Sequence, residues 1–348
     1  MSYPPYTITG AILNLVAAIS EQIAGLAAAG VLSEHSLSPQ LRRENRIRTI
    51  HASLAIENST LDLEQVTAVI DGKPVIAPPR DVQEVRGAVA AYEKLDTWSP
   101  YSMEDVLAAH ALLMHDLVAN PGKLRSGGVG IFHGDRVVHL APPAELIHGH
   151  LARLLHWLQT TDEHPLITSC VFHYEFEFIH PFADGNGRMG RLWQTLILSR
   201  WKPVMAYVPV ETIVRNRQGA YYDSLGQADA QGEATVFIAF MLQALQDALS
   251  VFQTTTQVAT QVTTQVTTQV PSHIKRLLIA LEKGEQSAGE LMRTLGLKSG
   301  KNFRIASLTP ALAAGFVERT QPDAPRSPTQ RYRLTAEGRK VVHLMRSG

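Results

Sequence analysis

Apolar residues recur at intervals of three and four through most of the first 250 positions, and this spacing predicts helices. Glycine and proline mark several of their ends: Gly30 closes the first helix, and Pro79 opens the third. The helices predicted in this way cover residues 7–32, 39–58, 79–95, 103–118, 143–159, 166–178 and 188–200. The pattern therefore predicts a mainly α fold for this part of the chain.

One segment breaks the helical pattern. Residues 127–141 carry β-branched runs on both sides of Gly134-Asp135, a dipeptide typical of two-residue hairpin turns. We expect a small β-hairpin here. An extended edge strand can bind another chain by main-chain pairing. The alternative is a surface hairpin that only covers the core.

The stretch Thr254–Pro271 has low complexity, because Thr-Gln-Val recurs every four residues. A period of four fits a strand or a helix without selecting either. Because this run is uncharged and rich in Thr, we interpret it first as a linker and second as an oligomerising strand or helix. The sequence does not decide between these alternatives.

Residues 272–348 show the pattern of a winged helix-turn-helix. Three amphipathic helices are followed by two short strands around a Pro-rich turn, and a last helix closes the chain. The predicted helices are 274–281, 287–295, 301–314 and 335–346, and the strands are 316–319 and 330–334. Fold does not fix function, so both DNA binding and a protein-contact or dimerisation role stay open.

The net charge of zero conceals two oppositely charged parts. Residues 272–348 hold 14 basic and 6 acidic residues, whereas the rest of the chain has an excess of eight acidic residues. A basic module on an acidic body suggests contact with nucleic acid. The candidate DNA-binding residues lie on or before the third helix and in the second strand: Lys298, Lys301, Arg304, Arg331 and Arg333.

Composition limits the class of protein. The chain has 348 residues, 45% hydrophobic and 18% charged, which is typical of two or three soluble globular domains. The one cysteine, Cys170, excludes an internal disulfide framework, and its apolar helical surroundings favour a core position over a nucleophile. Residues 11–32 are interrupted by Asn14, Glu21 and Gln22, and the N-terminus lacks a basic leader. We expect a cytoplasmic protein without a membrane span.

Residues 180–191 (HPFADGNGRMGR) concentrate the chemistry of the chain. His180 is a general base near neutral pH, and Asp184 offers the hard oxygen that a divalent ion prefers. The two glycines allow backbone N–H groups to approach phosphate oxygens, and the two arginines can each bind phosphate through two hydrogen bonds. The segment also leads into a predicted helix, whose N-terminus favours anions. The phosphate-binding candidates are Gly185, Asn186, Gly187, Arg188 and Arg191.

This segment resembles the signature of the Fic family, H-P-F-x-[DE]-G-N-G-R-x-x-R, at every position. The resemblance implies a Fic-type helical bundle that transfers AMP from ATP to a protein hydroxyl with release of pyrophosphate. His180 would then be the base, Phe182 the anchor of the loop and Asp184 the Mg²⁺ ligand. The stretch 185–187 would form the anion hole, and Asn186 and Arg188 join His180 as catalytic candidates. Arg188 and Arg191 would hold the β and γ phosphates.

The predicted hairpin lies in a segment that also resembles the family, from Pro121-Gly122 and Arg125 to Pro142-Pro143. In the family this hairpin is a flap over the active site. The resemblance implies that a target protein docks on it. The docking candidates are Val129, Gly130, Ile131 and Phe132.

A second motif precedes the signature. Residues 53–58 match the family's inhibitory pattern, [ST]-x-x-x-E-[GN], with Ser53, Glu57 and Asn58 at its defined positions. Ser53 and Glu57 lie four apart, on one face of a helix. The resemblance implies that Glu57 occupies Arg191 and displaces the γ-phosphate. The chain would then carry its own inhibitory helix, on the N-terminal side of the signature.

The remaining histidines do not form a metal site by their spacing. Among them are His110, His115, His148 and His150, with no cluster of carboxylates or thiolates beside them. Because zinc sites need three or four ligands, we interpret these histidines as surface or core residues and expect no zinc.

Together these patterns predict a self-inhibited protein adenylyltransferase that uses ATP and Mg²⁺. We expect four regions: 1–100 with the inhibitory helix, 101–253 as the catalytic core, 254–271 as the linker and 272–348 as the winged helix. The expected partner is a hydroxyl-bearing target protein, with DNA and a second copy of the chain as open alternatives. The rival activities are removal of AMP, phosphate transfer at the same site, and transcriptional regulation through nucleotide sensing. Gly187 disfavours phosphate transfer, because related phosphotransferases carry Lys at that position.

Overall fold

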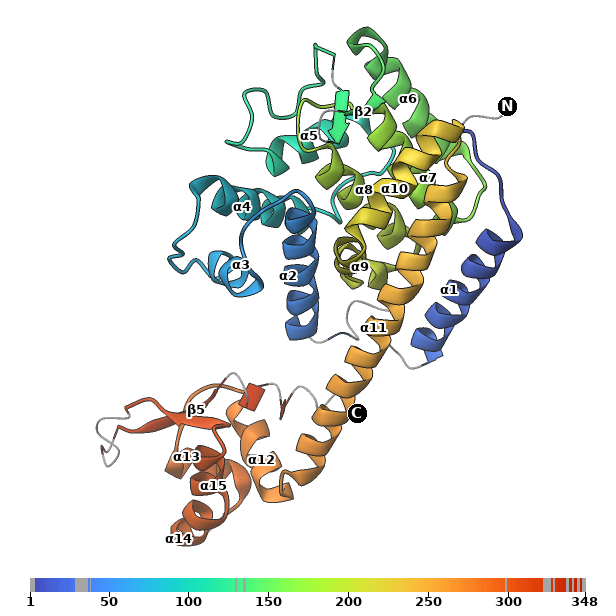
Figure 1. Cartoon of the computed structure of the whole chain (residues 1–348). Helices are drawn as coiled ribbons and strands as arrows, with labels where there is room; N and C mark the ends of the chain where they lie inside the picture. The colour runs from blue at the N-terminus through green and yellow to red at the C-terminus, as the bar shows by residue number, and fades with distance from the viewer. Residues whose placement is uncertain are drawn as a thin grey trace. The chain divides into compact units, whose positions relative to one another are not determined.

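A computed structural model describes residues 4–28, 37, 39–128, 130–133, 136–297, 299–321, 327, 329–335, 338–339, 341–342 and 345. It divides the chain into two units, Met1–Thr254 and Thr255–Gly348 (Figure 1). Each unit has its own hydrophobic core and is described by itself.

In its described residues the first unit has helices and one hairpin as its regular elements, so the predicted mainly α fold is confirmed. Its helices are α1 (Gly10–Ala28), α2 (Pro39–Ile56), α3 (Leu63–Ile70), α4 (Pro79–Glu93), α5 (Met103–Leu113), α6 (Ala144–Thr160), α7 (Pro165–Ile179), α8 (Asn186–Trp201), η2 (Pro203–Tyr207), α9 (Val210–Asn216), α10 (Gln218–Gln231) and the first part of α11 (Thr235–Gln269), which continues into the second unit. Proline begins α2, α4 and α7, as expected where a missing N–H costs nothing. Helix α3 begins with a capping box between Asp62 and Gln65, a local signal that the apolar spacing alone did not reveal.

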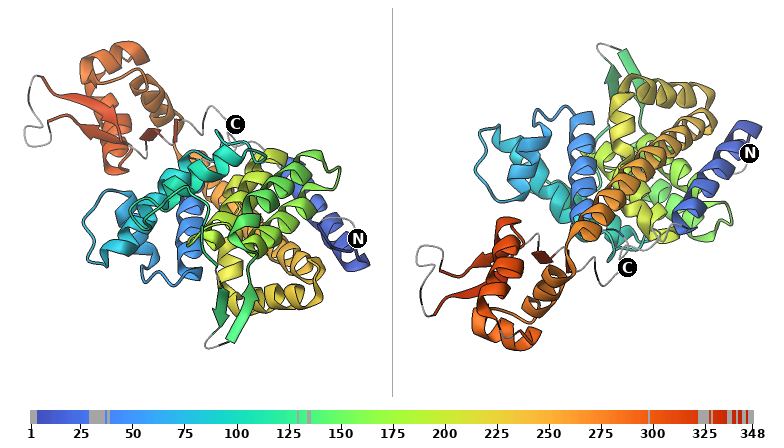
Figure 2. Two further views of the ribbon diagram at one scale, coloured as in Figure 1. Left: turned by 90° about the horizontal axis from the view of Figure 1, so that it is seen from above. Right: turned by 90° about the horizontal axis from the view of Figure 1, so that it is seen from below.

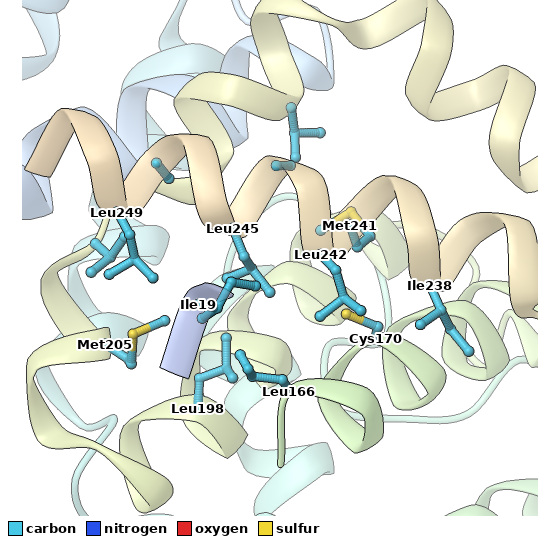
Figure 3. Close-up of a cluster of buried hydrophobic side chains, with 14 of the residues drawn as sticks. Ile19, Leu166, Cys170, Leu198, Met205, Ile238, Met241, Leu242, Leu245 and Leu249 are labelled. Carbon is cyan, nitrogen blue, oxygen red and sulfur yellow. The ribbon is translucent and has the colours of Figure 1, made fainter. Parts of the chain in front are cut away.

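Helix α7 separates two hydrophobic clusters of the first unit. Leu166, Cys170 and Tyr174 pack with α1 and α11 on one side, whereas Phe172 and Phe176 pack with α2, α4, α5 and α6 on the other. Figure 3 shows side chains of α11 pointing toward those of α7 and α8 in the first cluster. Because α7 is buried on both sides, the segments that follow it are fixed in position. The predicted core position of Cys170 is confirmed, and burial raises the pKa of its thiol to about 12.

Among the described residues, two helices are long and apolar enough to cross a membrane by length and composition. They are Gly10–Ala28, and Thr235–Thr256 at the start of α11, of which half is buried in the protein. The second runs across one face of the first unit (Figure 2, right). Core helices meet the same criteria, so the absence of a membrane span stays a prediction.

The predicted hairpin is present. Strand β1 (Gly130–His133) pairs antiparallel with β2 (Arg136–Leu140), beginning with Gly130 opposite Leu140. The register shifts between Ile131 and Phe132, which indicates a bulge or irregularity. Val129 and the expected turn residues Gly134 and Asp135 lie outside the described residues.

The second unit contains short helices and a three-stranded antiparallel sheet of order β3-β5-β4. Its elements are α12 (Ser272–Leu281), β3 (Gln286–Ser287), α13 (Ala288–Leu295), α14 (Gly300–Phe303), η3 (Arg304–Leu308), α15 (Thr309–Ala313), β4 (Val317–Arg319) and β5 (Arg331–Leu334). The helix expected over 301–314 is present as continuous helical backbone over 300–313, with a π-helical turn (η3) between the two α segments. The winged helix class itself stays a prediction.

The Thr-Gln-Val stretch is helical backbone, since α11 continues to Gln269. The boundary between the two units falls within this helix, after Thr254. Of the two conformations left open, strand and helix, the stretch adopts the helix. Its role as a linker stays a prediction.

Candidate active site

Residues 180–185 form a sharp loop between α7 and α8, and residues 186–191 belong to the first turns of α8. His180 caps α7 in the left-handed region, with φ of 50°, and Gly185 caps the start of α8 with φ of 86°. A side chain at position 185 would also place its Cβ 2.6 Å from the sulfur of Met114. Glycine is therefore required at 185 for two reasons. The loop delivers the first N–H groups of α8 to the same place as the His180 ring.

Asn186 holds the loop in shape. Its side-chain oxygen accepts a hydrogen bond from the Phe182 N–H at 2.9 Å, and its amide donates to the Phe182 carbonyl at 2.8 Å. Phe182 is fully buried, as the resemblance implied for an anchor. Asn186 is itself buried, so in this structure its side chain braces the backbone of the loop.

His110 supports the same loop from α5, a role that the sequence did not reveal. Its ring stacks on Phe182 at 3.7 Å between centroids. Its Nδ1 accepts a hydrogen bond from the Gly122 N–H at 2.8 Å, so the opposite nitrogen, Nε2, donates to the Asp184 carbonyl at 3.0 Å. Burial lowers the pKa of His110, which keeps this neutral tautomer in place. The interpretation of His110 as a surface or core residue left its burial open, and it missed the contact with the signature.

Arg125 ties the His180 turn to the base of the hairpin. Its Nε donates to the His180 carbonyl at 2.7 Å, and its two terminal nitrogens donate to the carbonyls of Gly127 and Pro142 at 2.7 and 2.6 Å. The Arg125 N–H also donates to the Pro181 carbonyl at 2.9 Å. The side chain is 6% exposed, and burial lowers its pKa. One buried guanidinium therefore fixes both flanks of β1–β2 against the candidate base.

Arg188 and Asp184 belong to a charged cluster that α4 completes. Arg188 is 4% exposed and contacts Glu84 at 3.2 Å and Asp184 at 3.1 Å. Arg80 also reaches Asp184, at 3.1 Å. Burial raises the pKa of Glu84, while Arg188 and Arg80 oppose that shift. Glu84 and Arg80 carry no sequence motif, so only the packing of α4 beside the loop identifies them.

Arg191 is held by the inhibitory motif from α2. Its Nη2 lies 2.7 Å from the Glu57 carboxylate and 3.0 Å from the Ser53 carbonyl, and its Nε donates to the Ser53 hydroxyl at 3.1 Å. Arg191 is 2% exposed. Burial opposes its charged form, but Glu57, Tyr221 and Glu177 together raise its pKa. The structure therefore brings together two motifs that lie more than a hundred residues apart.

Backbone geometry explains two further positions of these motifs. Asn58 follows α2 with φ of 67°, a left-handed conformation in which glycine and asparagine are common after a helix. At Gly187, an added Cβ would lie 2.4 Å from Oε1 of Glu57. Glycine at 187 thus leaves room for the carboxylate to reach Arg191.

A pocket of about 910 Å³ opens where these groups meet. His180, Gly187, Arg191 and Glu57 line it on one side, and α10 forms the other wall. The His180 Nδ1 lies 3.3 Å from the Glu177 carbonyl. The sequence did not predict the contribution of α10, because its residues match no part of the signature.

Helix α10 also contacts the end of the inhibitory helix. Gln218 donates to the Ile56 carbonyl at 2.9 Å, and the Tyr222 hydroxyl donates to it at 3.4 Å. The same helix therefore lines the pocket and holds the turn that carries Glu57.

The remaining site candidates are not among the residues that line this pocket, and some lie outside the described residues. The backbone of Gly130, Ile131 and Phe132 forms β1. Lys301 and Arg304 are exposed, and Lys298 lies outside the described residues. Arg331 pairs with Glu290 at 2.9 Å, and Arg333 pairs with Glu318 at 2.6 Å and with Glu285 at 3.3 Å. Both arginines of β5 are therefore already engaged within the second unit.

Comparison with known proteins agrees with the geometry. The family model described as Fic/DOC family matches residues 100–198. A second one, described as the C-terminal domain of filamentation induced by cAMP protein Fic-like, matches residues 272–335. The protein adenylyltransferase Fic of Nematostella vectensis is 27% identical over 226 residues, which are 62% of this chain and 50% of the relative. The protein adenylyltransferase fic-1 of Caenorhabditis briggsae is 30% identical over 218 residues, 58% of this chain and 40% of the relative. The chain thus spans half or less of the length of these two relatives.

Solved structures extend the likeness to nearly the whole chain. Fic-1 from C. elegans, 21% identical with a TM-score of 0.56 over 72% of each chain, shares the fold. The crystal structure of a Fic family protein from Desulfovibrio desulfuricans G20 is 57% identical, with a TM-score of 0.74. That match covers 96% of this chain and 99% of the other. On this similarity, together with the complete signature around His180, the chain belongs to the Fic family.

Proposed function

We propose that this protein transfers AMP from ATP to a hydroxyl group of a target protein, and that it inhibits itself. The observation that carries the proposal is the position of the Glu57 carboxylate, 2.7 Å from Arg191 in the pocket that His180 also lines. A buried guanidinium suited to phosphate is here held by a carboxylate of the same chain.

The start of α8 supports polyphosphate binding. The N–H groups of the first helical turn have no intrahelical partner, and the helix dipole favours an anion in front of them. Gly187 has no side chain to block the approach, and Arg191 lies one helical turn further along. We assign the anion hole to residues 185–187 and the outer phosphates to Arg188 and Arg191.

Asp184 suits a magnesium ion that is shared with the nucleotide. Its side chain is 41% exposed, and its oxygens are hard ligands. No cluster of three or more metal-binding side chains occurs among the described residues. A single carboxylate agrees with Mg²⁺, which usually binds through one or two carboxylates, substrate phosphates and water. Bound there, the ion would neutralise phosphate charge.

His180 is proposed to accept the proton of the target hydroxyl. With its own proton on Nδ1, facing the Glu177 carbonyl, the ring keeps Nε2 as the basic nitrogen. The hydroxyl oxygen then bonds to the α-phosphorus, the bond from that phosphorus to the bridging oxygen breaks, and pyrophosphate leaves. The hairpin, which Arg125 connects to this turn, is proposed to hold the target segment by main-chain pairing.

The wall formed by α10 is proposed to hold the nucleoside. Tyr222 and other polar residues of this helix line the pocket, together with Gly187 and Arg191, the proposed phosphate-binding residues. An aromatic ring with nearby hydrogen-bonding groups suits a purine base. The preferred nucleotide is proposed to be ATP, on the names of the adenylyltransferase relatives.

The deciding experiment separates AMP transfer from its rivals. Purified wild type and Glu57→Gly would be incubated with ATP labelled on the α or the γ phosphate, and protein-bound label would be measured. Label from the α position alone supports AMP transfer, whereas label from the γ position would establish phosphate transfer. Removal of AMP, with Glu57 placing a water, would appear as loss of α label on later addition of wild type.

For the second unit we propose contact with DNA, on its excess of basic residues. Lys301 and Arg304 are exposed, which supports the proposal, but the ion pairs of Arg331 and Arg333 weaken their candidacy. Mobility of a duplex with the full chain tests it, because each phosphate contact lowers log affinity by about 0.9 per log unit of salt. Absence of binding at low salt would favour a protein contact, including a homodimer.

A cytoplasmic location is likewise proposed, from the single buried cysteine.

A further inference from the structure

A second pocket of the first unit has no role in the proposed reaction. It has a volume of about 660 Å³ and is lined by parts of α2, α4, α8 and η2. Its size lies within the range of small-molecule sites, roughly 300–1,000 Å³. The side chains that characterise it are four arginines and two tyrosines: Arg42, Arg43, Arg46, Arg200, Tyr92 and Tyr207.

Arg46 is the central cation of this pocket. Its guanidinium lies over the ring of Tyr92, 4.8 Å from the centroid, and over the ring of Tyr207, at 5.4 Å. Within the described part of the chain, its Nη1 is buried without a hydrogen-bond partner. Burial lowers its pKa, while charge interactions with Tyr92, Tyr207 and Glu211 and a side-chain hydrogen bond with Tyr207 oppose that shift. The guanidinium is therefore only partly paired, whereas buried polar groups in proteins are normally paired.

Arg42 repeats the observation one helical turn away. It lies on the same face of α2 as Arg46, and its Nε is also buried with no partner among the described residues. The other two arginines differ. Arg43 forms an ion pair with Asp71, and Arg200 donates to the Asp96 carbonyl at 2.8 Å. Unused donor capacity is therefore found on the two arginines of α2 that share a face.

Acidic groups near the pocket do not satisfy these donors. Glu93 and Asp96 line it, but both are exposed residues. The buried carboxylate of Glu211 lies behind the tyrosines and accepts from the Tyr92 hydroxyl at 3.4 Å and the Thr195 hydroxyl at 3.3 Å. Arg42 and Arg46 line the pocket with partly exposed side chains, so an anion that enters from solvent can contact their guanidinium groups.

We propose that this pocket binds a small phosphorylated molecule through Arg42 and Arg46. Guanidinium groups match phosphate oxygens in charge and in hydrogen-bond geometry, and a phosphate in the pocket would contact the guanidinium groups of both side chains. The tyrosine rings and the apolar residues Ile47 and Ile50 give the pocket a wall that an organic group can contact. The expected ligand is therefore a phosphate ester, with a ring or chain that reaches beyond the phosphate.

The position of the pocket links it to the active site. Arg42 and Arg46 lie on α2, the helix that also carries Ser53 and leads to Glu57. Thr195, which contacts Glu211 behind the pocket, also donates to the backbone carbonyl of Arg191 at 3.1 Å. An occupant would thus contact the helix that supplies the inhibitory residues.

Calorimetric titration with inorganic phosphate and with phenyl phosphate tests the proposal. Wild type should bind one phenyl phosphate in this pocket, more tightly than inorganic phosphate, because the ring adds apolar contact. Arg42→Gln should weaken that binding by about tenfold or more, as expected for one lost hydrogen bond between charged groups. The matched control is Arg48→Gln, an exposed arginine of the same helix, which should bind like wild type.

Two results would overturn the proposal. The first is absence of binding to wild type, and the second is equal binding by wild type and Arg42→Gln, which would place the phosphate elsewhere, including at Arg191. Arg46→Met is a second variant, and thermal melting of each variant shows whether it is folded. No step of this test depends on ATP or on AMP transfer, so failure of the proposed function would leave its result unchanged.

Discussion

Two sets of arginine–glutamate pairs in this protein have nearly the same contact distances and very different surroundings. Arg191 lies 2.7 Å from Glu57 and is 2% exposed, whereas Arg333 lies 2.6 Å from Glu318 with half of its side chain exposed. Contact distance therefore does not distinguish them. Burial does distinguish them, because water screens the charges of the exposed pair strongly and those of the buried pair far less.

The two sets also differ in what they connect. The partners of Arg191 come from a helix 134 residues earlier in the chain, whereas Arg333 and Glu318 lie 15 residues apart on neighbouring strands. In the first pair, Glu57 occupies Arg191, a group suited to binding a substrate, and both line a pocket large enough for one. The comparison supports the proposal that the buried pair acts as a switch, whereas the exposed pairs of β5 belong to the surface of the second unit.

The largest expected effect comes from the base beside the buried pair. His180→Ala should lower AMP transfer by about 10²–10⁴-fold, since a positioned general base contributes this much. The measurement is the rate of α-label incorporation at saturating ATP, in the background of Glu57→Gly so that inhibition does not mask it. His115→Ala, at an exposed histidine, is the matched control and should react at the parent rate. Equal rates for the two variants would remove His180 from the mechanism.

A somewhat smaller effect is expected at Arg125, which positions His180 without contacting substrate. Arg125→Lys keeps the charge but cannot reach the carbonyls of His180, Gly127 and Pro142 together. A misplacement of about 1 Å can cost roughly 10²-fold in rate, so kcat should fall by about that factor. The KM for ATP should change little, because the residues proposed to bind its phosphates are unchanged. A rise in the KM for ATP at unchanged kcat would contradict a positioning role.

Arg125 also shows where sequence reasoning ends. The signature is a local motif, so its loop and the following helix could be predicted from twelve consecutive residues. The contacts that hold the loop come from elsewhere: His110 from α5, Arg125 from before the hairpin and Glu84 from α4. Apolar periodicity shows which face of a helix is buried, but not which polar atom meets which loop.

Fold prediction shows the same division between local and distant information. The spacing of apolar residues predicted α2, α4, α6 and the hairpin close to their observed bounds. It missed α3, a helix of 8 residues that begins with a capping box. The helix predicted over 301–314 is present, but the spacing did not reveal the π-helical turn within it, which lies just before Pro310, a residue that has no N–H to bond to the preceding turn.

An increase in activity is expected from the switch itself. Glu57→Gly should raise AMP transfer by about tenfold or more, because a charge-assisted pair contributes on the order of 1.5–3 kcal/mol. Glu57→Gln should give a smaller rise, since it removes the charge but keeps a hydrogen-bonding group. Initial rates with α-labelled ATP would measure both.

Adding Arg191→Ala to Glu57→Gly should abolish the gain, because the γ-phosphate then loses its partner. Activity of Glu57→Gly at or below that of wild type would refute the switch and favour a role for Glu57 in placing a water.

The smallest effect is expected in the second unit, and it tests the other half of the comparison. Arg331→Gln removes the pair with Glu290, but Glu290 still accepts a hydrogen bond from the Ser287 N–H at 2.7 Å in the capping box of α13. The start of that helix is therefore preserved, and an exposed pair contributes little by itself. We expect the melting curve and the AMP transfer rate of Arg331→Gln to match wild type within replicate scatter. A clear loss of melting temperature would show that exposed pairs in this unit are coupled into a network, and the contrast with Arg191 would then reflect position in the fold more than burial.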